Sequence, residues 1–384
     1  MKFSKVAIAT AAVLAASAVH AQTANVTLYG GLRLALESAT YKGPAGSARI
    51  TSLENISSRW GMRGSESLGG GMSAIFQLES GFAADTGANG VSGGVQQIFS
   101  REAWVGLSGG FGTVRLGYGL TPYDDVLGWA HHQGANSWEN RNNGVSGGAG
   151  FAKRDLFTNY VNTSGCASTA FDARYGNSLS YATPDMGGFS VRTQYALLGE
   201  ATSNSCTGWD TAFKYNKGPI TAGVAYAMHR NFTSISSAAH NDDALRAYVG
   251  YNFGIAKIDG TYETARYKLA TGTLKYKYWE LGALVPAGAW TLGVQYSQRD
   301  KGLAALYNPL NQTLAGIVTG ARWDNGGGKH LSLTADYALS KRTTLRGYYT
   351  QLQNEATLTN TTATGVFAGK AKINALSLGL WHSF

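Results

Sequence analysis

Arginine recurs in this sequence at positions that an extended strand would place on one face. Arg59 and Arg63 flank Gly61 in SRWGMRG, so the three residues share a face if the segment is a strand. The positions of this kind are Arg33, Arg59, Arg63, Arg101 and Arg174. Guanidinium groups stay charged near low-dielectric walls, where they focus field lines and concentrate anions. The alternative is that each arginine pairs with a nearby acid and serves only solubility.

Other patterns that could do chemistry are weaker. The adjacent His131 and His132 could bind a metal ion, but on a glycine-rich loop such residues are more often merely polar. GGFGTVRLG resembles a nucleotide-binding glycine run only superficially, because a hairpin and not a helix would contain it. The arginines are dispersed and lack an RNA-binding signature. We therefore predict no metal site, no cofactor and no nucleic-acid partner.

The first residues of the chain indicate its compartment. Two lysines in MKFSK precede the apolar run VAIATAAVLAASA, and the small residues Val19 and Ala21 follow it. This pattern predicts a secretory signal peptide over residues 1–21 and a mature chain over 22–384. A short membrane anchor is the alternative, but the run is too short to span a bilayer. Removing a leader that holds Lys2 and Lys5 and no acid changes the formal net charge from +9 to +7.

Composition favours an all-β fold. The mature chain has no apolar run long enough for a transmembrane helix. The sequence contains 51 glycines, 21 tyrosines and 9 tryptophans but only 6 prolines, which suits neither a helical protein nor an α/β enzyme. The abundant aromatic residues argue against disorder. The remaining class is an all-β fold, in which short strands are joined by many turns.

Alternation of apolar and polar residues predicts these strands. In DALRAYVGYNFG, residues 243–254, Leu245 and Val249 face one way while Arg246 and Asn252 face the other. The same period occurs in GAWTLGVQYSQRD, HLSLTADYALS and GFSVRTQYAL. Segments of roughly ten residues match the span of a tilted transmembrane β-strand. A soluble sandwich or propeller would also alternate, but its outward face would be charged and not rich in leucine, valine and aromatic residues.

Short and long connections alternate between the predicted strands. The short, turn-like ones include 69–71, 108–111, 184–188, 215–219, 253–257, 285–288 and 339–342. The longer polar ones lie around 38–55, 84–96, 120–172, 201–208, 231–242, 301–329 and 355–370, with a shorter one at 268–273. This arrangement predicts a transmembrane antiparallel up-and-down β-barrel of about sixteen strands in one domain.

The chain ends in LSLGLWHSF, in which Leu376, Leu378, Leu380 and Phe384 share one face of a strand. An isolated strand of this kind would be an aggregation hazard. We expect it to pair with NVTLYGGLRLALE, residues 25–37, so that the barrel closes and lipid covers the apolar face.

Several segments resemble the general porins of Gram-negative bacteria, in particular the trimeric porins of β-proteobacteria. The resemblance is carried by NVTLYG, SRWGMRGSESLGGGMSAIFQLESGF (58–82), FSREAWVGLSGGFGTVRLG (99–117), RYGNSLSYATPDMGGFSVRTQY (174–195) and the terminal aromatic strand. It implies a sixteen-stranded homotrimeric barrel in the outer membrane, in contact with lipid and lipopolysaccharide, that passes small hydrophilic solutes. It also implies that the barrel-assembly machinery reads Phe384. Trp381 stands where the family often has a basic residue, a departure that should matter little to assembly.

The resemblance further implies which arginines narrow the channel. Arg59, Arg101 and Arg174 match the family's basic cluster at the narrowest point. Arg33 and Arg63 match the pattern only as inward-facing basic positions, and so does Arg115.

The long loop that follows the fifth predicted strand matches the third extracellular loop of the family, which folds into the barrel. Its first part is GYGLTPYDDVLGWAHHQGANSWENRNNG, residues 117–144, and a loop this long is usually functional. By resemblance, Asp124 and Asp125 are its acidic constriction residues and would oppose the basic cluster. They could also cap a short helix in DDVLGWA. Glu139 matches less well.

More inward arginine than identifiable inward acid predicts a channel with mild anion selectivity. The alternative is a solute-specific channel for a sugar or an organic anion, in which Tyr248, Trp279 and Tyr348 would form an aromatic slide. An outer-membrane hydrolase would need a serine and a histidine on neighbouring strands. The seven histidines lie mostly in the leader, the loops or the terminal strand, so we expect no enzyme.

Cys166 and Cys206 are the only cysteines in the sequence, and both fall in predicted extracellular segments. An oxidising envelope permits a disulfide, and neighbouring barrel loops can meet. We therefore favour a Cys166–Cys206 disulfide over two free thiols. A metal pair would lack further ligands nearby.

Overall fold

The computed structural model describes residues 25–43, 46–89, 91–92, 95–129, 171, 173–198, 206–231, 241–269, 272–300, 327–354, 361–362, 365–366 and 371–384. The predicted signal peptide, residues 1–21, lies outside these ranges. Antiparallel strands dominate the described residues, together with the short 3₁₀ helix η1 (Pro122–Asp125). No helix in these ranges is long and apolar enough to cross a membrane.

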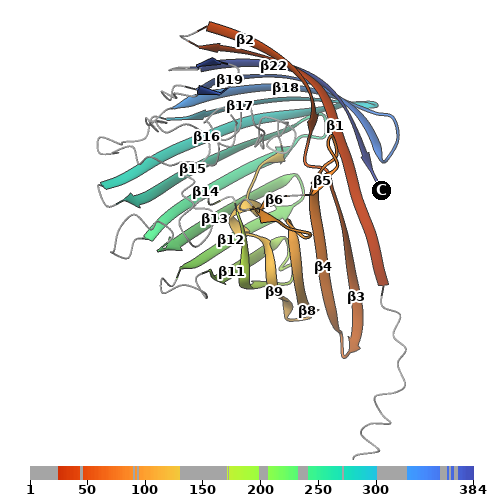
Figure 1. The fold of residues 1–384 in the computed structure, drawn as a ribbon. Helices are drawn as coiled ribbons and strands as arrows, with labels where there is room; N and C mark the ends of the chain where they lie inside the picture. The colour runs from red at the N-terminus through yellow and green to blue at the C-terminus, as the bar shows by residue number, and fades with distance from the viewer. Residues whose placement is uncertain are drawn as a thin grey trace, which may run out of the picture.

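The strands form one twisted antiparallel sheet that closes on itself (Figure 1). The main strands are β1 (Asn25–Gly43), β2 (Gly46–Asn55), β3 (Arg59–Gly69), β4 (Met72–Ala83), β8 (Glu102–Gly109), β9 (Gly112–Leu120), β10 (Arg174–Ala182), β11 (Phe189–Leu197), β12 (Thr207–Lys217), β13 (Ile220–Arg230), β14 (Asn241–Asn252), β15 (Lys257–Leu269), β16 (Gly272–Ala287), β17 (Trp290–Arg299), β18 (Gly328–Ala338), β19 (Thr343–Asn354) and β22 (Ala371–Ser383). Short strands between them are β5 (Ala88–Asn89), β6 (Val91–Ser92), β7 (Val95–Gln96), β20 (Thr361–Thr362) and β21 (Gly365–Val366). With β2 and β3 counted as one interrupted strand and β5 left out, the barrel has sixteen strands, which confirms the predicted architecture.

The first and last strands close the barrel as predicted. β1 pairs with β22 in continuous register from Gly31 opposite Ser383 to Lys42 opposite Lys372. At the very end, Gly30 and Phe384 exchange backbone hydrogen bonds of 3.2 and 3.1 Å. Figure 1 shows the C-terminus beside β1. Neither terminal strand is therefore left with an open edge.

The first hairpin differs from the prediction of a long polar loop over 38–55. Residues 34–43 of β1 pair with residues 46–55 of β2 without interruption. The segment is polar, but its threonines and isoleucine suit a strand. β2 and β3 are separated at residues 56–58, where Ser57 has a φ of 60° and the Ile56 N–H donates to the Arg33 carbonyl at 2.8 Å. This interruption is a local bulge in one long strand.

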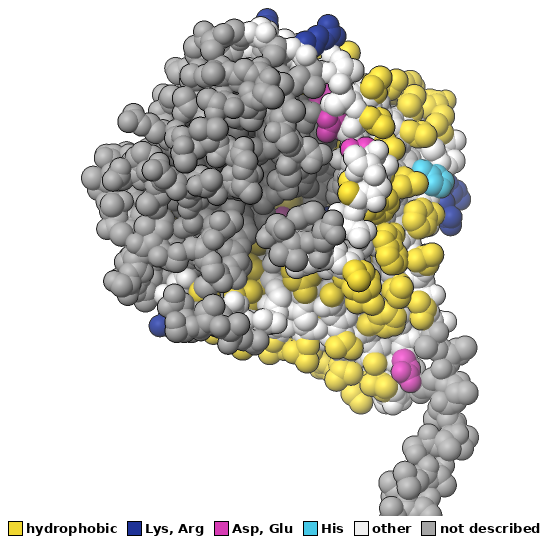
Figure 2. All heavy atoms as spheres, viewed as in Figure 1, with side chains coloured by type: hydrophobic (Ala, Val, Ile, Leu, Met, Phe, Trp, Pro, Cys, Tyr) yellow, Lys and Arg dark blue, Asp and Glu magenta, His cyan; other side chains and the backbone are white. Residues whose placement is uncertain are grey.

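Outward and inward faces alternate along the strands as the sequence predicts. On β22, Leu376 is 65% exposed whereas Ser377 is 4% exposed. Hydrophobic side chains cover much of the described outer surface on the side of β1, β3 and β4 (Figure 2). An apolar exterior and a polar interior are the reverse of a soluble protein and are typical of a barrel surrounded by lipid.

Tight turns join the strands at one rim. The β3–β4 connection is Gly69, Gly70 and Gly71, with φ values of 79°, 59° and 77°. Only glycine adopts this conformation at three successive positions without strain. The glycine run found in the sequence therefore marks a turn, as predicted.

Candidate functional site

Arginines from neighbouring strands line one side of the lumen. Arg33 interacts electrostatically with Arg59, Arg346 and Arg101, and Arg59 interacts with Arg101 and Arg174. We call this set the basic arc; in spatial order it is Arg346 on β19, Arg33 on β1, Arg59 on β3, Arg101 just before β8 and Arg174 on β10. The sequence pattern predicts all of these inward positions except Arg346. The alternation in TTLRGYYTQ, which places Leu345 outward, is the signal that could have found it.

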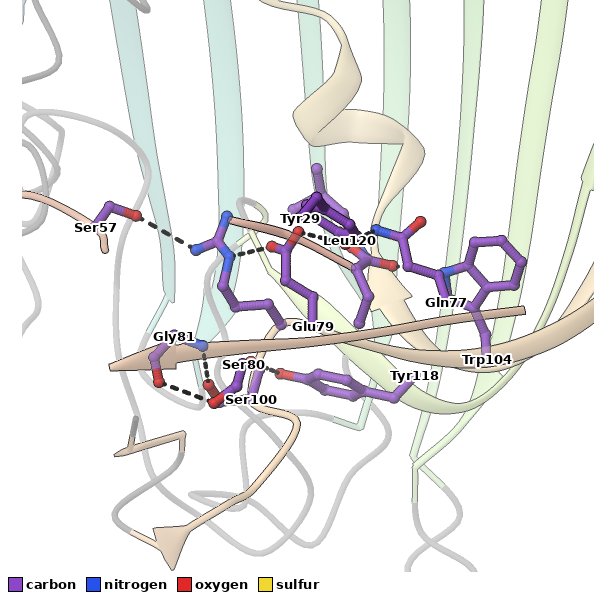
Figure 3. A network of polar contacts seen from close by, with 12 residues as sticks. Tyr29, Ser57, Gln77, Glu79, Ser80, Gly81, Ser100, Trp104, Tyr118 and Leu120 are labelled. Atoms are coloured by element: carbon purple, nitrogen blue, oxygen red, sulfur yellow. Dashed lines mark hydrogen bonds and ion pairs between the residues drawn. The ribbon is translucent and has the colours of Figure 1, made fainter. Parts of the chain in front are cut away.

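Glu79 on β4 holds one member of the basic arc. Its Oε1 accepts a hydrogen bond from Arg101 Nε at 2.5 Å, and its Oε2 accepts one from the Tyr29 hydroxyl at 2.9 Å. Gln77 donates to the Tyr29 hydroxyl at 2.8 Å, and Arg101 Nη1 lies 3.5 Å from Ser57 Oγ. Figure 3 shows Tyr29, Gln77 and Glu79 gathered in this network. Arg101 is therefore fixed by an acid partner.

Arg33 and Arg59 differ from Arg101, because neither makes an ion pair with any described residue. Arg174 Nε is buried without a hydrogen-bond partner among the described residues, and the Arg174 charge interacts with Arg101 and Asp124. The alternative that each arginine only pairs with a nearby acid therefore fits Arg101 but does not fit Arg33 and Arg59. Their charges remain available to solutes in the lumen.

Two further arginines from the sequence analysis lie beside the basic arc. Arg63, toward the β3–β4 turn, is exposed, with its guanidinium carbon 5.3 Å from the Tyr29 ring centroid. Arg115 on β9 lies 4.3 Å from the Trp104 ring centroid and interacts electrostatically with Arg192. Both side chains lie on the inward faces of their strands, against aromatic rings of neighbouring strands.

The two loop acids interact with arginines of β10 and β11. Asp125 Oδ2 forms an ion pair with Arg192 Nη1 at 2.6 Å, and Arg192 Nη2 donates to the Leu120 carbonyl at 2.6 Å. Asp124 interacts electrostatically with Arg174. The helix η1, which carries both acids, contacts β11, β12 and β13 of the inner wall. The predicted position of the acids opposite the basic arc stays a prediction. The acids are the last two residues of η1, whose N-cap is Thr121. The described helix therefore precedes the one predicted in DDVLGWA, and the acids do not cap it.

The root and the end of the long loop pack on the inner wall of the barrel. Tyr123, Val126 and Phe171 form a buried cluster with residues of β12–β15, namely Ala212, Ala225, Ala227, Ala244, Ala265 and Tyr267. Arg246 Nη1 donates to the Tyr123 carbonyl at 3.3 Å and pairs with Glu263. We call the five alanines the alanine bed, because their small side chains leave room for the loop. The described part of the loop thus enters the lumen, as predicted.

Residues 130–170 of the loop lie outside the described residues. They include His131, His132, Glu139 and Cys166, whose roles stay predictions.

Charges that meet the lumen are mostly positive. The inward acids on the wall beneath the loop are Asp210, Asp242, Asp259, Glu263 and Glu280, each at most 3% exposed. By contrast, Arg33, Arg59, Arg101 and Arg174 are all partly exposed. A solute in the lumen therefore approaches guanidinium groups more closely than it approaches these carboxylates.

Comparison with known proteins agrees with this geometry. Residues 9–357 match the sequence model of the Gram-negative porin family. The chain belongs to the Gram-negative porins. It is an outer-membrane β-barrel whose lumen provides a path for passive diffusion.

Individual relatives cover the whole porin. The chain is 30% identical to outer membrane porin protein 32 of Delftia acidovorans over 400 residues, which is 100% of both proteins. It is 25% identical to the major outer membrane protein P.IA of Neisseria meningitidis, covering 98% of this chain and 99% of that one. Among solved structures, the anion-selective porin from Comamonas acidovorans matches with a TM-score of 0.64 and 25% identity, over 94% of this chain and 100% of that one.

Aromatic residues of the porin do not form the proposed slide. Tyr248 and Tyr348 face inward, but each is engaged by the wall: the Tyr248 hydroxyl lies 2.8 Å from Thr221 Oγ1, and Tyr348 donates to Glu37 at 2.7 Å. Trp279 lies on the outer face, next to Tyr296 at a centroid distance of 5.3 Å. Its parity along β16 matches that of the outward Leu281, because side chains of a strand alternate. The assignment of Trp279 to the lumen was wrong.

Cys206 is buried, and its Sγ lies 3.2 Å from the Asn231 carbonyl oxygen. Its predicted partner, Cys166, lies outside the described residues, so the Cys166–Cys206 disulfide stays a prediction. In the described ranges, no group of three or more His, Cys, Asp or Glu could hold a metal ion.

Proposed function

We propose that this porin is a mildly anion-selective channel for small hydrophilic solutes. The observation that carries the proposal is a difference in exposure between arginines and acids of the inner wall. Four arginines of the basic arc are partly exposed, whereas the acids on the wall beneath the loop and the fifth arginine, Arg346, are buried. Partly exposed guanidinium groups raise the local concentration of anions, whereas covered carboxylates do little to attract cations. The likeness to a solved anion-selective porin supports the same sign of selectivity.

Arg59, Arg101 and Arg174 form the basic side of the narrowest point in this proposal, with Arg33 and Arg63 as further inward cations. Asp124 and Asp125 reduce the positive field at the end of the basic arc, since Asp125 pairs with Arg192. The chain passes solutes by diffusion and performs no catalysis on them.

Swelling of liposomes that contain the porin tests the passive part of the proposal. Uncharged sugars of graded size should enter at rates that fall smoothly with size and do not saturate with concentration. A solute-specific channel would instead saturate with one sugar or one organic anion. Such saturation would contradict a general diffusion channel and would support a solute-specific one.

The assembly of the porin is proposed from its resemblance to trimeric relatives. We infer a homotrimer embedded in outer-membrane lipid and lipopolysaccharide, secreted with residues 1–21 as a cleaved signal peptide. The barrel-assembly machinery would read the terminal strand and Phe384. The exposed leucines of β22 and the terminal aromatic residue support this reading.

A further inference from the structure

Trp381 contacts two arginines of the basic arc. It lies on the inner face of β22, opposite Arg33 on β1 and opposite Thr344 on β19. The guanidinium carbon of Arg33 lies 4.8 Å from the Trp381 ring centroid, and that of Arg346 lies 3.7 Å from it. The indole thus interacts with guanidinium groups from both strands that flank β22.

The two arginines are held by different means. Arg346 is 3% exposed and makes a bidentate ion pair with Asp336, in which Nε lies 2.5 Å from Oδ1. Arg33 makes no ion pair with any described residue, and it is repelled by Arg346 and Arg59. The indole of Trp381 contacts the Arg33 guanidinium directly, whereas Glu79 attracts the Arg33 charge without forming an ion pair.

Arg33 runs along the wall and not straight into the bore. A Cβ atom placed on Gly31 would lie 4.0 Å from Arg33 Nε, so the side chain folds back along β1 toward Gly31. The same arrangement recurs at Arg115, which lies over Trp104, and at Arg63, which lies over Tyr29. Stacking inward guanidinium groups on aromatic rings of neighbouring strands is thus a repeated feature of this lumen.

We propose that Trp381 is a positioning residue that keeps the Arg33 guanidinium flat against the barrel wall. In this position the Arg33 charge contributes to the electrostatic potential of the lumen, and the side chain does not narrow the lumen. The inference rests on the proposed function only in requiring an open, conducting bore. Loss of the aromatic face would lower the population of the wall-bound Arg33 conformer about two- to fivefold. The released side chain would extend into the lumen and fluctuate there.

Single-channel recording of Trp381→Leu and Trp381→Phe porin tests the proposal. Trp381→Leu removes the aromatic face and should give a lower conductance with more open-channel current noise. Trp381→Phe keeps a face for the guanidinium and should conduct like the parent. Trp209→Leu is the matched control, because Trp209 lies on the outer face and makes no contact with a described arginine.

A double variant decides whether Trp381 acts through Arg33. In Arg33→Gln porin, adding Trp381→Leu should change neither conductance nor noise, since the side chain that Trp381 restrains is gone. An effect of Trp381→Leu that persists undiminished in the Arg33→Gln background would overturn the proposal, as would parent-like conductance of Trp381→Leu. Should Trp381→Leu not assemble, Trp381→Thr provides a second unstacked variant with good strand propensity.

This test is separate from that of ion selectivity. A porin without anion preference could still show the Arg33-dependent change in conductance, which would uphold the role of Trp381 while removing the proposed selectivity.

Discussion

A carboxylate partner separates two kinds of arginine in the lumen. Arg101 is paired with Glu79, whereas Arg59 has no ion pair within the described part of the chain. The two should therefore respond differently to removal of their charge, although both belong to the basic arc.

Arg59→Gln should lower the anion preference and leave barrel stability near that of the parent. Arg101→Gln should lower the anion preference and also destabilise the barrel by about 1–3 kcal/mol, because it leaves the buried Glu79 without its cationic partner. Reversal potentials measure the anion preference. The barrel stability is measured by heating samples to increasing temperatures and finding, from their mobility on a gel, the temperature at which the folded barrel is lost. Arg63→Gln, an exposed lumen arginine without an acid partner in the described ranges, is the stability control. Equal stability of the Arg59 and Arg101 variants would contradict the distinction.

For single residues, the sequence predicts on which face of a strand an arginine lies better than it predicts which acid the arginine pairs with. A period of two places Arg33, Arg59 and Arg174 on inward faces, because a strand allows only two faces. It cannot tell that Arg101 meets Glu79 or that Asp125 meets Arg192. Those pairs depend on the register between β4 and β8 and on the course of the loop after β9.

At the scale of secondary-structure elements, the long loop packs on inward alanines of the barrel wall that the sequence does not mark as functional. The alanine bed on β12–β15 makes room for Tyr123, Val126 and Phe171. An inward alanine carries no signal of its own, since it is small and apolar on a face that is otherwise polar. Only the packing of the loop gives it a role.

A large side chain in the alanine bed should displace the loop. Ala244→Phe would occupy the space that the loop cluster fills, so we expect a larger single-channel conductance and weaker discrimination by solute size. Overpacking of this kind typically costs about 1–3 kcal/mol, so the loop should move away from the wall and not remain packed against the larger side chain. Ala247→Phe, on the outer face of the same strand, is the matched control and should conduct like the parent. Unchanged conductance of Ala244→Phe would show that the loop does not depend on this bed.

For the whole molecule, closure of the barrel follows from the pairing of β1 with β22. Alternation and turn residues predicted the number of strands and the closing pair. The hairpin over 38–55 escaped prediction, because polar residues in a strand beyond the lipid resemble a loop. Outside the lipid, neither face of a strand has to be apolar.

Gly30 lies at the closing point and should tolerate no side chain. A Cβ atom there would lie 2.4 Å from Phe384 Cζ and 2.7 Å from the Arg59 carbonyl oxygen, and the backbone oxygen cannot move cheaply. Gly30→Val should therefore reduce the yield of heat-modifiable folded barrel. Gly31→Ala is the control, since its Cβ would approach no atom closer than 3.4 Å. Equal yields from the two variants would contradict this account of the closure.

The predicted Cys166–Cys206 disulfide would tie two extracellular segments of the barrel together. Mass measurement after alkylation without reduction should find no modified thiol in the mature porin. Two alkylated cysteines would dispose of the bridge.

We expect the partly exposed guanidinium groups of the basic arc to set the sign of the electric field inside the barrel. The most direct test of this expectation is the reversal potential of the porin in a planar bilayer that separates two concentrations of KCl. The account predicts a potential of the sign set by chloride, with a preference that weakens as salt rises and screens the basic arc. A reversal potential of the sign set by potassium would contradict it.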